Sequence, residues 1–233
     1  MRDNEFSLPQ GTIAFSHALP AHIYTLVTGG RPPAADWLQK ASRGKIWAID
    51  HGLDLCRAMN RTPDFLLGDG DSAAPDAWAW ALARGVPCER FNVKKDLTDT
   101  QLALAKIKEA STDAFLLLTG AFGGRFDHAM SSLFSCAFSG LPMILADDKE
   151  ACFFLHDGES LSFRAKQKPQ AISLFALGSE CRGLSIEGVE WPLENASLRP
   201  EEPYAVSNEL AEGSSAFHVR LQAGTLAVYL YWQ

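Results

Sequence analysis

The chain has 233 residues, of which 47% are hydrophobic and 21% charged, values that are ordinary for a globular protein of one large or two small domains. The formal net charge is -7 and no run of lysine or arginine occurs, which argues against binding to a nucleic-acid backbone. No apolar stretch of about eighteen residues is present, and the segment MRDNEFSLPQ shows no basic part followed by an apolar one. We therefore expect a cytoplasmic protein with neither a membrane span nor a signal peptide.

The first eighteen or so residues are weakly patterned, and we expect them to form an extension. From about residue 21 to residue 145, short apolar runs alternate with amphipathic stretches, a pattern that predicts a parallel sheet flanked by helices. The predicted strands cover 22–28, 45–50, 64–68, 114–119 and 142–145. The predicted helices cover 34–42, 75–84, 98–110 and 126–139, with Thr98 as an N-cap.

The pattern changes after Asp147, where short apolar runs are separated by segments rich in turn residues. The predicted strands there cover 151–155, 171–176, 216–221 and 226–231. This pattern indicates an antiparallel β domain. The predicted fold class is therefore an α/β domain over residues 20–147 followed by a β domain over residues 148–233, with the boundary near 147–150.

Five cysteines are spread along the chain, an odd number with no CxxC pair. This spacing fits reduced thiols better than a disulfide framework or a zinc site. We expect all five to serve in packing.

Polar motifs stand directly after several predicted strands, and ligands of open parallel α/β sheets bind outside the carboxyl ends of the strands. In chain order the motifs are DHG at 50–52, GDGDS at 68–72 and GAFGGRFDH at 120–128, with KDLTD at 95–99 before a predicted helix. Each motif alone could be a solvated turn or a helix cap. Together, at successive strand ends, they predict a site.

The aspartates of these motifs would repel one another at one sheet edge unless they shared a cation. Carboxylate oxygens suit Mg²⁺, which commonly takes phosphate oxygens as further ligands. The glycines of GAFGGR allow backbone N–H groups to approach phosphate closely, and Arg125 can donate paired hydrogen bonds to it. The motifs therefore predict a magnesium and nucleotide-phosphate site.

The segment after the first predicted strand, Thr28-Gly29-Gly30-Arg31, is not GxGxxG, which argues against a Rossmann dehydrogenase.

The order DHG, GDGDS, KDLTD, GAFGGRFDH resembles the thiamine pyrophosphokinases, whose pattern runs roughly DGG, GDFDS, KDxTD, GxxGGRxDH. The resemblance continues in GVEWPL at 188–193 and in Ser207-Asn208-Glu209, and it covers about residues 24–231. It implies an ATP- and magnesium-binding α/β domain over 20–147 and a thiamine-binding, dimerising β-sandwich over 148–233. The implied reaction converts ATP and thiamine to AMP and thiamine diphosphate, and the implied assembly is a homodimer.

The resemblance also implies roles for individual residues of the motifs. The implied metal ligands are Asp69, Asp71 and Asp99, with Asp50 beside them. The implied ATP-binding residues are Lys95, Thr98, Gly123, Gly124, Arg125, Asp127 and His128, with Asp96 shaping the phosphate site. Asp50, Asp71, Asp96, Asp99 and Arg125 form the implied catalytic set, in which either Asp50 or Asp96 accepts the proton of the acceptor. Ser207 and Asn208 are the candidates for the thiamine side.

Two positions depart from the family pattern. His51 stands where the pattern has glycine, at a position that could need a positive φ, and Gly70 stands where it has an aromatic residue. These departures leave open an acceptor other than thiamine, such as a pterin, and a protein that binds nucleotide without turnover. His128 could equally cap or pack its helix, and we expect Trp191 to pack in a core or an interface.

Overall fold

The computed structural model describes residues 3–68, 70, 73–91 and 96–233. The chain divides into two compact units, one of which is Pro20–Asp147. The other joins the residues up to Leu19 with Asp148–Gln233, so both ends of the polypeptide belong to it. Three of the predicted site residues, Asp69, Asp71 and Lys95, lie outside the described residues.

The Pro20–Asp147 unit contains parallel strands in the spatial order β8-β7-β3-β4-β5-β6. Their bounds are β3 His22–Val27, β4 Lys45–Ile49, β5 Phe65–Gly68, β6 Cys88–Arg90, β7 Ala114–Thr119 and β8 Met143–Ala146. Every residue of β7 is buried, as expected for a parallel strand covered on both faces. The chain runs outward from β3 through β4 to one edge and then returns through β7 to the other. The strand order therefore reverses between β3 and β7, which is where open α/β sheets bind ligands.

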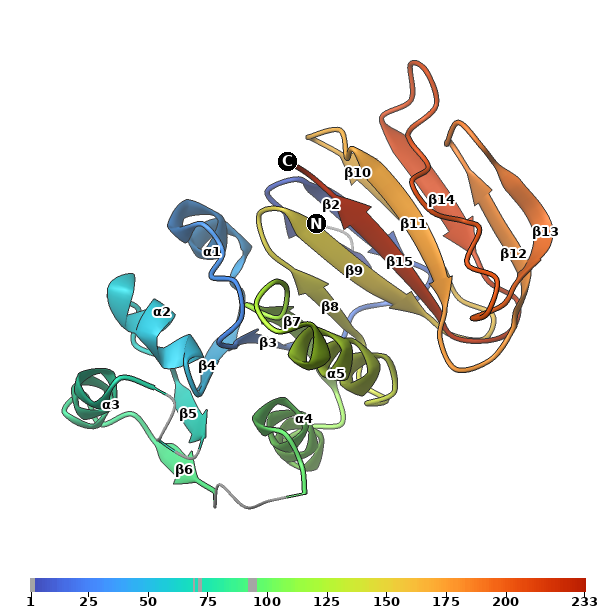
Figure 1. Ribbon diagram of the computed structural model, residues 1–233. Helices are drawn as coiled ribbons and strands as arrows, with labels where there is room; N and C mark the ends of the chain where they lie inside the picture. Colours follow the sequence, from blue (N-terminus) through green and yellow to red (C-terminus); the bar gives the residue numbers. More distant parts are fainter. Residues whose placement is uncertain (1–2, 69, 71–72, 92–95) are drawn as a thin grey trace. The chain divides into compact units, whose positions relative to one another are not determined.

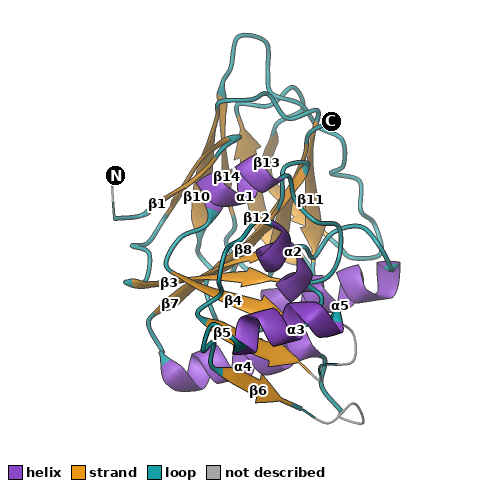
Figure 2. Ribbon diagram, turned by 90° about the vertical axis from the view of Figure 1, so that its left-hand side faces the viewer, coloured by secondary structure: helices purple, strands orange, loops and turns teal. Residues whose placement is uncertain are grey.

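Helices cover both faces of this sheet, with α1, α2 and α3 on one face and α4 and α5 on the other (Figure 1). Their bounds are α1 Ala35–Ala41, α2 Gly52–Ala58, α3 Pro75–Leu82, α4 Asp99–Ala110 and α5 Phe126–Ala137. Figure 2 shows α2 and α3 lying over the strands of the first face.

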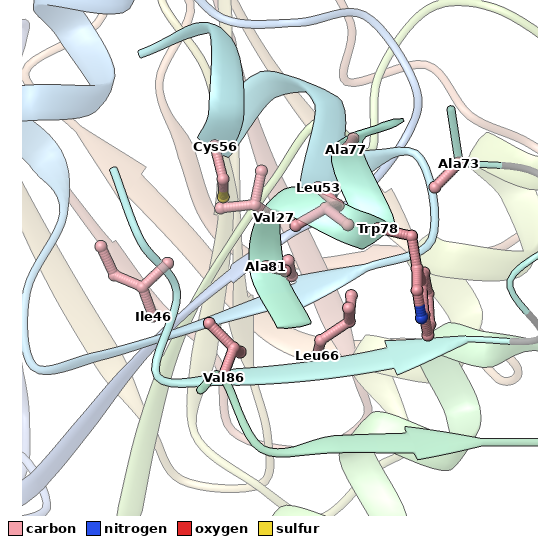
Figure 3. Packing of buried hydrophobic residues seen from close by; sticks show 11 residues of the cluster. Val27, Ile46, Leu53, Cys56, Leu66, Ala73, Ala77, Trp78, Ala81 and Val86 are labelled. Carbon is pink, nitrogen blue, oxygen red and sulfur yellow. The ribbon is translucent and has the colours of Figure 1, made fainter. Parts of the chain in front are cut away.

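The core under α2 and α3 is built from apolar side chains of both helices and of the strands beneath them. Leu53 and Cys56 of α2 and Trp78 of α3 point toward Val27 and Leu66 of the sheet (Figure 3). Ala77 and Ala81 of α3 belong to the same buried cluster, and their small side chains allow α3 to approach the sheet closely. This packing holds α2, which begins at Gly52 of the DHG motif, against the sheet.

The predicted strands and helices of this unit are confirmed, and no predicted end differs from the observed one by more than two residues. Thr98 is confirmed as the N-cap of α4: its Oγ1 accepts from the N–H of Gln101 at 3.2 Å, while its own N–H donates to Gln101 Oε1 at 2.9 Å. Two elements were not predicted: α2, which has only two turns, and β6, a three-residue edge strand.

The other unit is built from antiparallel strands in two groups, β1-β2-β10-β14-β12-β13 and β11-β15-β9. The bounds are β1 Glu5–Leu8, β2 Gly11–Phe15, β9 Glu150–Leu155, β10 Ser160–Ala165, β11 Ala171–Ala176, β12 Cys181–Glu187, β13 Leu193–Leu198, β14 Ala216–Arg220 and β15 Leu226–Tyr231. The ring of Phe163 on β10 lies 6.1 Å from Phe153 on β9 and 6.0 Å from Trp232. The apolar faces of the two groups therefore pack against each other.

The expectation of an N-terminal extension was wrong. β1 and β2 form a hairpin, and β2 pairs with β10, so this segment completes the larger group of strands. Phe6 and Leu8 are buried while Glu5 and Ser7 are only partly so, a period-two alternation that the sequence analysis overlooked. Gly11 is required in β2 because a Cβ there would lie 2.3 Å from the ring of Phe163.

All five cysteines are free thiols, and Cys56, Cys136, Cys152 and Cys181 are buried as expected. Cys88 on β6 is exposed, so the packing assignment was wrong for this residue. Within the described part of the chain, no helix has the length and apolar character that a bilayer crossing requires.

Candidate active site

A pocket of about 730 Å³ opens at the carboxyl ends of the parallel strands, around the point where the strand order reverses. Three of the four motifs contribute to it: Asp50 and His51 from the first, Thr98 and Asp99 from the third, and Gly123, Gly124, Arg125 and His128 from the fourth. It is also lined by residues that the sequence analysis did not assign, namely Thr28, Gly29, Gly30, Arg31, Ile49, Thr100, Gly120, Ala121 and Ser132. The first, third and fourth motifs therefore share one pocket, while their roles in binding and catalysis stay predictions.

Backbone hydrogen bonds join the loop after β3 to the loop after β7 and form one wall of the pocket. The N–H of Gly30 donates to the carbonyl of Gly120 at 2.7 Å, and the N–H of Arg31 donates to the carbonyl of Phe122 at 2.7 Å. A Cβ on Gly30 would lie 2.3 Å from the Gly120 oxygen. Glycine is therefore required at position 30 for the two loops to meet.

Asp50 adopts the left-handed conformation, with φ at 46°. This region is unfavourable for most residues but tolerated by aspartate, and such backbone strain concentrates at functional sites. The turn carries the Asp50 carboxylate over the end of the neighbouring strand, where a Cβ on Gly68 would lie 1.9 Å from Asp50 Oδ1. The carboxylate thus occupies space that only glycine at position 68 leaves open.

His51 does not need the glycine that the family pattern has there. Its φ is -53°, so the concern that a side chain would be strained at this position was wrong. The Cβ of His51 lies beside Gly29, at 2.4 Å from the place that a Cβ of residue 29 would take. Nδ1 of His51 lies 3.2 Å from Oδ2 of Asp54, one turn further along α2. Gly70, by contrast, has φ at +78°, so a side chain there would be strained.

The first turn of α4 supplies Thr98 and Asp99 to the pocket. A carboxylate in this position interacts favourably with the positive end of the helix dipole. Asp96, two residues before the N-cap, is exposed and does not line the pocket. Among the two candidates for the proton acceptor, the pocket therefore contains Asp50 but not Asp96.

Arg125 precedes α5 and is held by Asp127 through Nε at 3.1 Å and Nη2 at 2.5 Å. These hydrogen bonds lower the pKa of Asp127 and raise that of Arg125. Both side chains are well exposed, and Asp127 does not line the pocket whereas Arg125 does. Gly123 and Gly124 have φ near +68° and +66°, which brings the loop round to the start of α5.

Arg31 and Asp147 form an ion pair that the sequence analysis missed. Nε and Nη2 of Arg31 lie 3.1 Å and 2.5 Å from Oδ2 of Asp147. Asp147 follows β8 and is fully buried. Their places in the sequence could have pointed to them, because Arg31 and Asp147 each follow the end of a predicted strand, as the recognised motifs do.

The described residues fit a magnesium ion in part. Asp50 and Asp99 bring two carboxylates to one pocket, and carboxylate oxygens are suitable Mg²⁺ ligands. Asp69 and Asp71, the other expected ligands, lie outside the described residues. Across residues 3–68, 70, 73–91 and 96–233, no group of three or more potential metal-binding side chains comes together.

Ser207 and Asn208 lie in the other unit, beside a hollow of about 160 Å³ that Trp191, Tyr204 and Asn208 help to line. The amide of Asn208 accepts from the N–H of Trp191 at 3.1 Å and donates to its carbonyl at 2.7 Å. Trp191 is 61% exposed, so it does not pack in the core, and its expected packing in an interface stays a prediction. Ser207 has φ at 58° and donates its N–H to Ser173 Oγ at 3.0 Å.

Two family models match this chain: the thiamin pyrophosphokinase catalytic domain over residues 38–144, and the thiamin pyrophosphokinase vitamin B1 binding domain over residues 160–226. Thiamine pyrophosphokinase 1 of Oryza sativa subsp. japonica is 28% identical over 149 residues, which cover 60% of this chain and 56% of the rice protein. The match therefore spans little more than half of that relative's length. Thiamine pyrophosphokinase of Bacillus subtilis is 22% identical over 85% of this chain and 89% of its own.

Solved structures agree on the fold. The thiamine pyrophosphokinase of Bacillus subtilis superposes with a TM-score of 0.77 at 20% identity, covering 91% of this chain and 99% of its own. The thiamin pyrophosphokinase of Candida albicans gives a TM-score of 0.73 at 15% identity, with 90% of each chain covered. With both family models matched in order, one on each unit of a fold that these enzymes share, the chain belongs to the thiamin pyrophosphokinase family.

Proposed function

We propose that this protein transfers the diphosphoryl group of ATP to the hydroxyl of thiamine, which gives thiamine diphosphate and AMP. The observation that carries the proposal is the pocket at the strand-order reversal, which Asp50, Asp99 and Arg125 all line, in a chain of this family. In a kinase of this type the protein acts mainly by positioning the reactants and neutralising charge.

We assign ATP and magnesium to residues 20–147 and thiamine to residues 148–233, which we propose to be a β-sandwich. The match of the catalytic model to 38–144 and of the vitamin B1 binding model to 160–226 supports this division. The packing of Phe163 against Phe153 and Trp232 supports the sandwich.

In the proposed reaction, the thiamine oxygen forms a bond to the β-phosphorus, and the bond from that phosphorus to the bridging oxygen of the α-phosphate breaks. The bridging oxygen and the bonding electrons leave with AMP. Asp50 accepts the hydroxyl proton, a role for which its place in the pocket favours it over Asp96. Arg125 stabilises phosphate charge, while the N–H groups of Gly123 and Gly124 approach phosphate oxygens. Lys95, Thr98 and His128 complete the proposed phosphate site, and Asp127 contributes to ATP binding by holding Arg125.

We propose Asp69, Asp71 and Asp99 as magnesium ligands, with Asp50 beside them. The pairing of Asp50 with Asp99 in one pocket supports this set, because two carboxylates in one pocket repel less when they share a cation. When bound, magnesium neutralises charge on the phosphate oxygens of ATP.

We propose Ser207 and Asn208 as residues of the thiamine site, where they position the loop that carries Trp191. Asn208 holds both polar backbone atoms of Trp191, and the ring of that tryptophan is exposed beside Tyr204. Exposed aromatic rings suit a flat cationic heterocycle. We also propose a homodimer, since each unit exposes large apolar side chains, among them Phe126 and Phe138 at the two ends of α5 and Trp191 and Val206 in the other unit.

The test is incubation with ATP and Mg²⁺ and a panel of acceptors, with AMP release and product mass measured. AMP together with thiamine diphosphate supports the proposal. AMP formed only with another acceptor, such as a hydroxymethyl pterin, contradicts the assignment of thiamine. Tight nucleotide binding without AMP contradicts enzymatic activity altogether.

A further inference from the structure

The side chain of Arg31 is held against the sheet by a buried carboxylate. Nε and Nη2 both lie within hydrogen-bond distance of Asp147 Oδ2, at 3.1 Å and 2.5 Å, which fixes the plane of the guanidinium. Asp147 is 0% exposed, and a buried carboxylate without a cation is strongly unfavourable. The pair is therefore expected to persist whether or not a ligand is bound.

The backbone of Arg31 is fixed as well. Its N–H donates to the carbonyl of Phe122 at 2.7 Å, and its Cβ lies 2.8 Å from the place that a Cβ of Gly123 would take. Arg31 thus lies on the backbone of the loop after β7, at the reversal of strand order. Its side chain is still 30% exposed and lines the pocket.

Arg125 is held quite differently. Of the described residues that line the pocket, Arg31 and Arg125 are the arginines. The Arg125 side chain is 74% exposed and its partner Asp127 is 61% exposed, so water competes for both. Arg31 is the less exposed of the two cations, and its partner is buried.

We propose that Arg31 binds the polyphosphate of ATP and that Asp147 is a positioning residue that orients it. This inference rests on the proposed function, because it assumes that the pocket takes a nucleotide. A guanidinium that is already oriented loses little conformational freedom when it binds phosphate. The pair is not visible in the sequence, because its members are 116 positions apart.

The first experiment measures KM for ATP, KM for thiamine, kcat and the dissociation constant of a non-hydrolysable ATP analogue with Mg²⁺. Arg31→Lys keeps the charge but loses the planar fork, so KM for ATP and the dissociation constant should rise about tenfold, while KM for thiamine changes less than about twofold. Asp147→Asn should shift the same two constants in the same direction. The double variant should be little worse than either single one, because both changes disturb one interaction.

Arg199→Lys is the matched control. Arg199 also donates from Nε to a carboxylate, Glu180 Oε1 at 3.1 Å, but it lies in the other unit. Its nucleotide constants should equal those of the wild type. Unchanged nucleotide constants in folded Arg31→Lys, with only a lower melting temperature, would show a purely structural pair and overturn the inference.

A second measurement uses the wild type and so does not depend on a variant folding. Modification by an arginine-selective dicarbonyl reagent is mapped by mass spectrometry with and without the ATP analogue and Mg²⁺. Slower labelling of Arg31 in the presence of nucleotide supports its role, and equal labelling of Arg31 while Arg125 is protected contradicts it. If wild type binds nucleotide but forms no thiamine diphosphate, the proposed function fails, and these binding constants still decide the role of Arg31.

Discussion

The carboxylate of Asp50 and the backbone of Gly68 are in direct contact across the ends of β4 and β5, where a Cβ on Gly68 would lie 1.9 Å from Asp50 Oδ1. The left-handed turn at Asp50 creates this contact, and glycine on the neighbouring strand permits it. The position of a proposed catalytic carboxylate therefore depends on a residue that has no side chain.

Gly68→Ala should displace Asp50 while leaving the strand in place. We expect kcat/KM to fall by about 10²-fold, since misplacing a catalytic group by about 1 Å has effects of that size. Asp50→Asn provides the comparison, and the double variant should match Asp50→Asn alone. Fully additive losses in the double variant would show that Gly68 acts by some route other than Asp50.

His51→Gly restores the glycine of the family pattern. Because His51 has an ordinary φ of -53°, its backbone gains nothing from glycine, and kcat/KM for thiamine should stay within about threefold of wild type. Steady-state kinetics with thiamine and ATP varied in turn would test this expectation. A tenfold or larger loss would mean that the imidazole itself binds a substrate.

Thr98→Ala removes the side-chain half of the capping box of α4. We expect the free energy of unfolding to fall by about 1 kcal/mol, as is usual for loss of an N-cap hydroxyl. Urea denaturation followed by circular dichroism measures it. Thr98→Ser keeps the hydroxyl and should retain the stability of the wild type; an equal loss in both variants would rule out the capping bond as the cause.

Thiol titration should distinguish Cys88 from the other cysteines. Burial raises the pKa of Cys56 to about 12, and it also raises the pKa of Cys152. A disulfide reagent at pH 8 should therefore modify one exposed thiol quickly, and Cys88→Ser should abolish that fast phase. Two fast thiols in the native protein would contradict the burial of the others.

The same buried thiols set a direction for stability at high pH. A raised pKa in the folded state means that the unfolded chain loses its thiol protons first, so stability is full below an ordinary cysteine pKa of about 8.5 and declines above it. The decline continues as the pH rises toward the value of about 12 for Cys56. Urea midpoints that rise between pH 9 and about 11 would contradict this sign.

Local patterns were sufficient to predict five of the six parallel strands and about half of the residues that line the pocket. Asp50, Thr98, Asp99 and Arg125 each stand beside a strand end or helix start, and parallel topology then brings such positions to one edge. The strand β7 was found because its apolar run is continuous and is bounded by Asp113 and Gly120.

What local patterns could not supply was long-range pairing. Arg31 and Asp147 meet because β3 and β8 both flank β7 in the folded sheet. The sequence around either residue contains no pattern that predicts this contact. The hairpin of β1 and β2 depends in the same way on β10, with which β2 pairs. Strands of four and five residues gain their stability from such partners rather than from their own sequence.

We expect the β- and γ-phosphoryl groups of ATP to move together onto thiamine. The most direct measurement uses ATP labelled at the β-phosphorus, with Mg²⁺ and thiamine, and follows the label by chromatography and mass spectrometry. We predict that the label appears in thiamine diphosphate in an amount equal to the AMP formed. Label recovered only in ADP or in free pyrophosphate, with thiamine unchanged, would contradict the account.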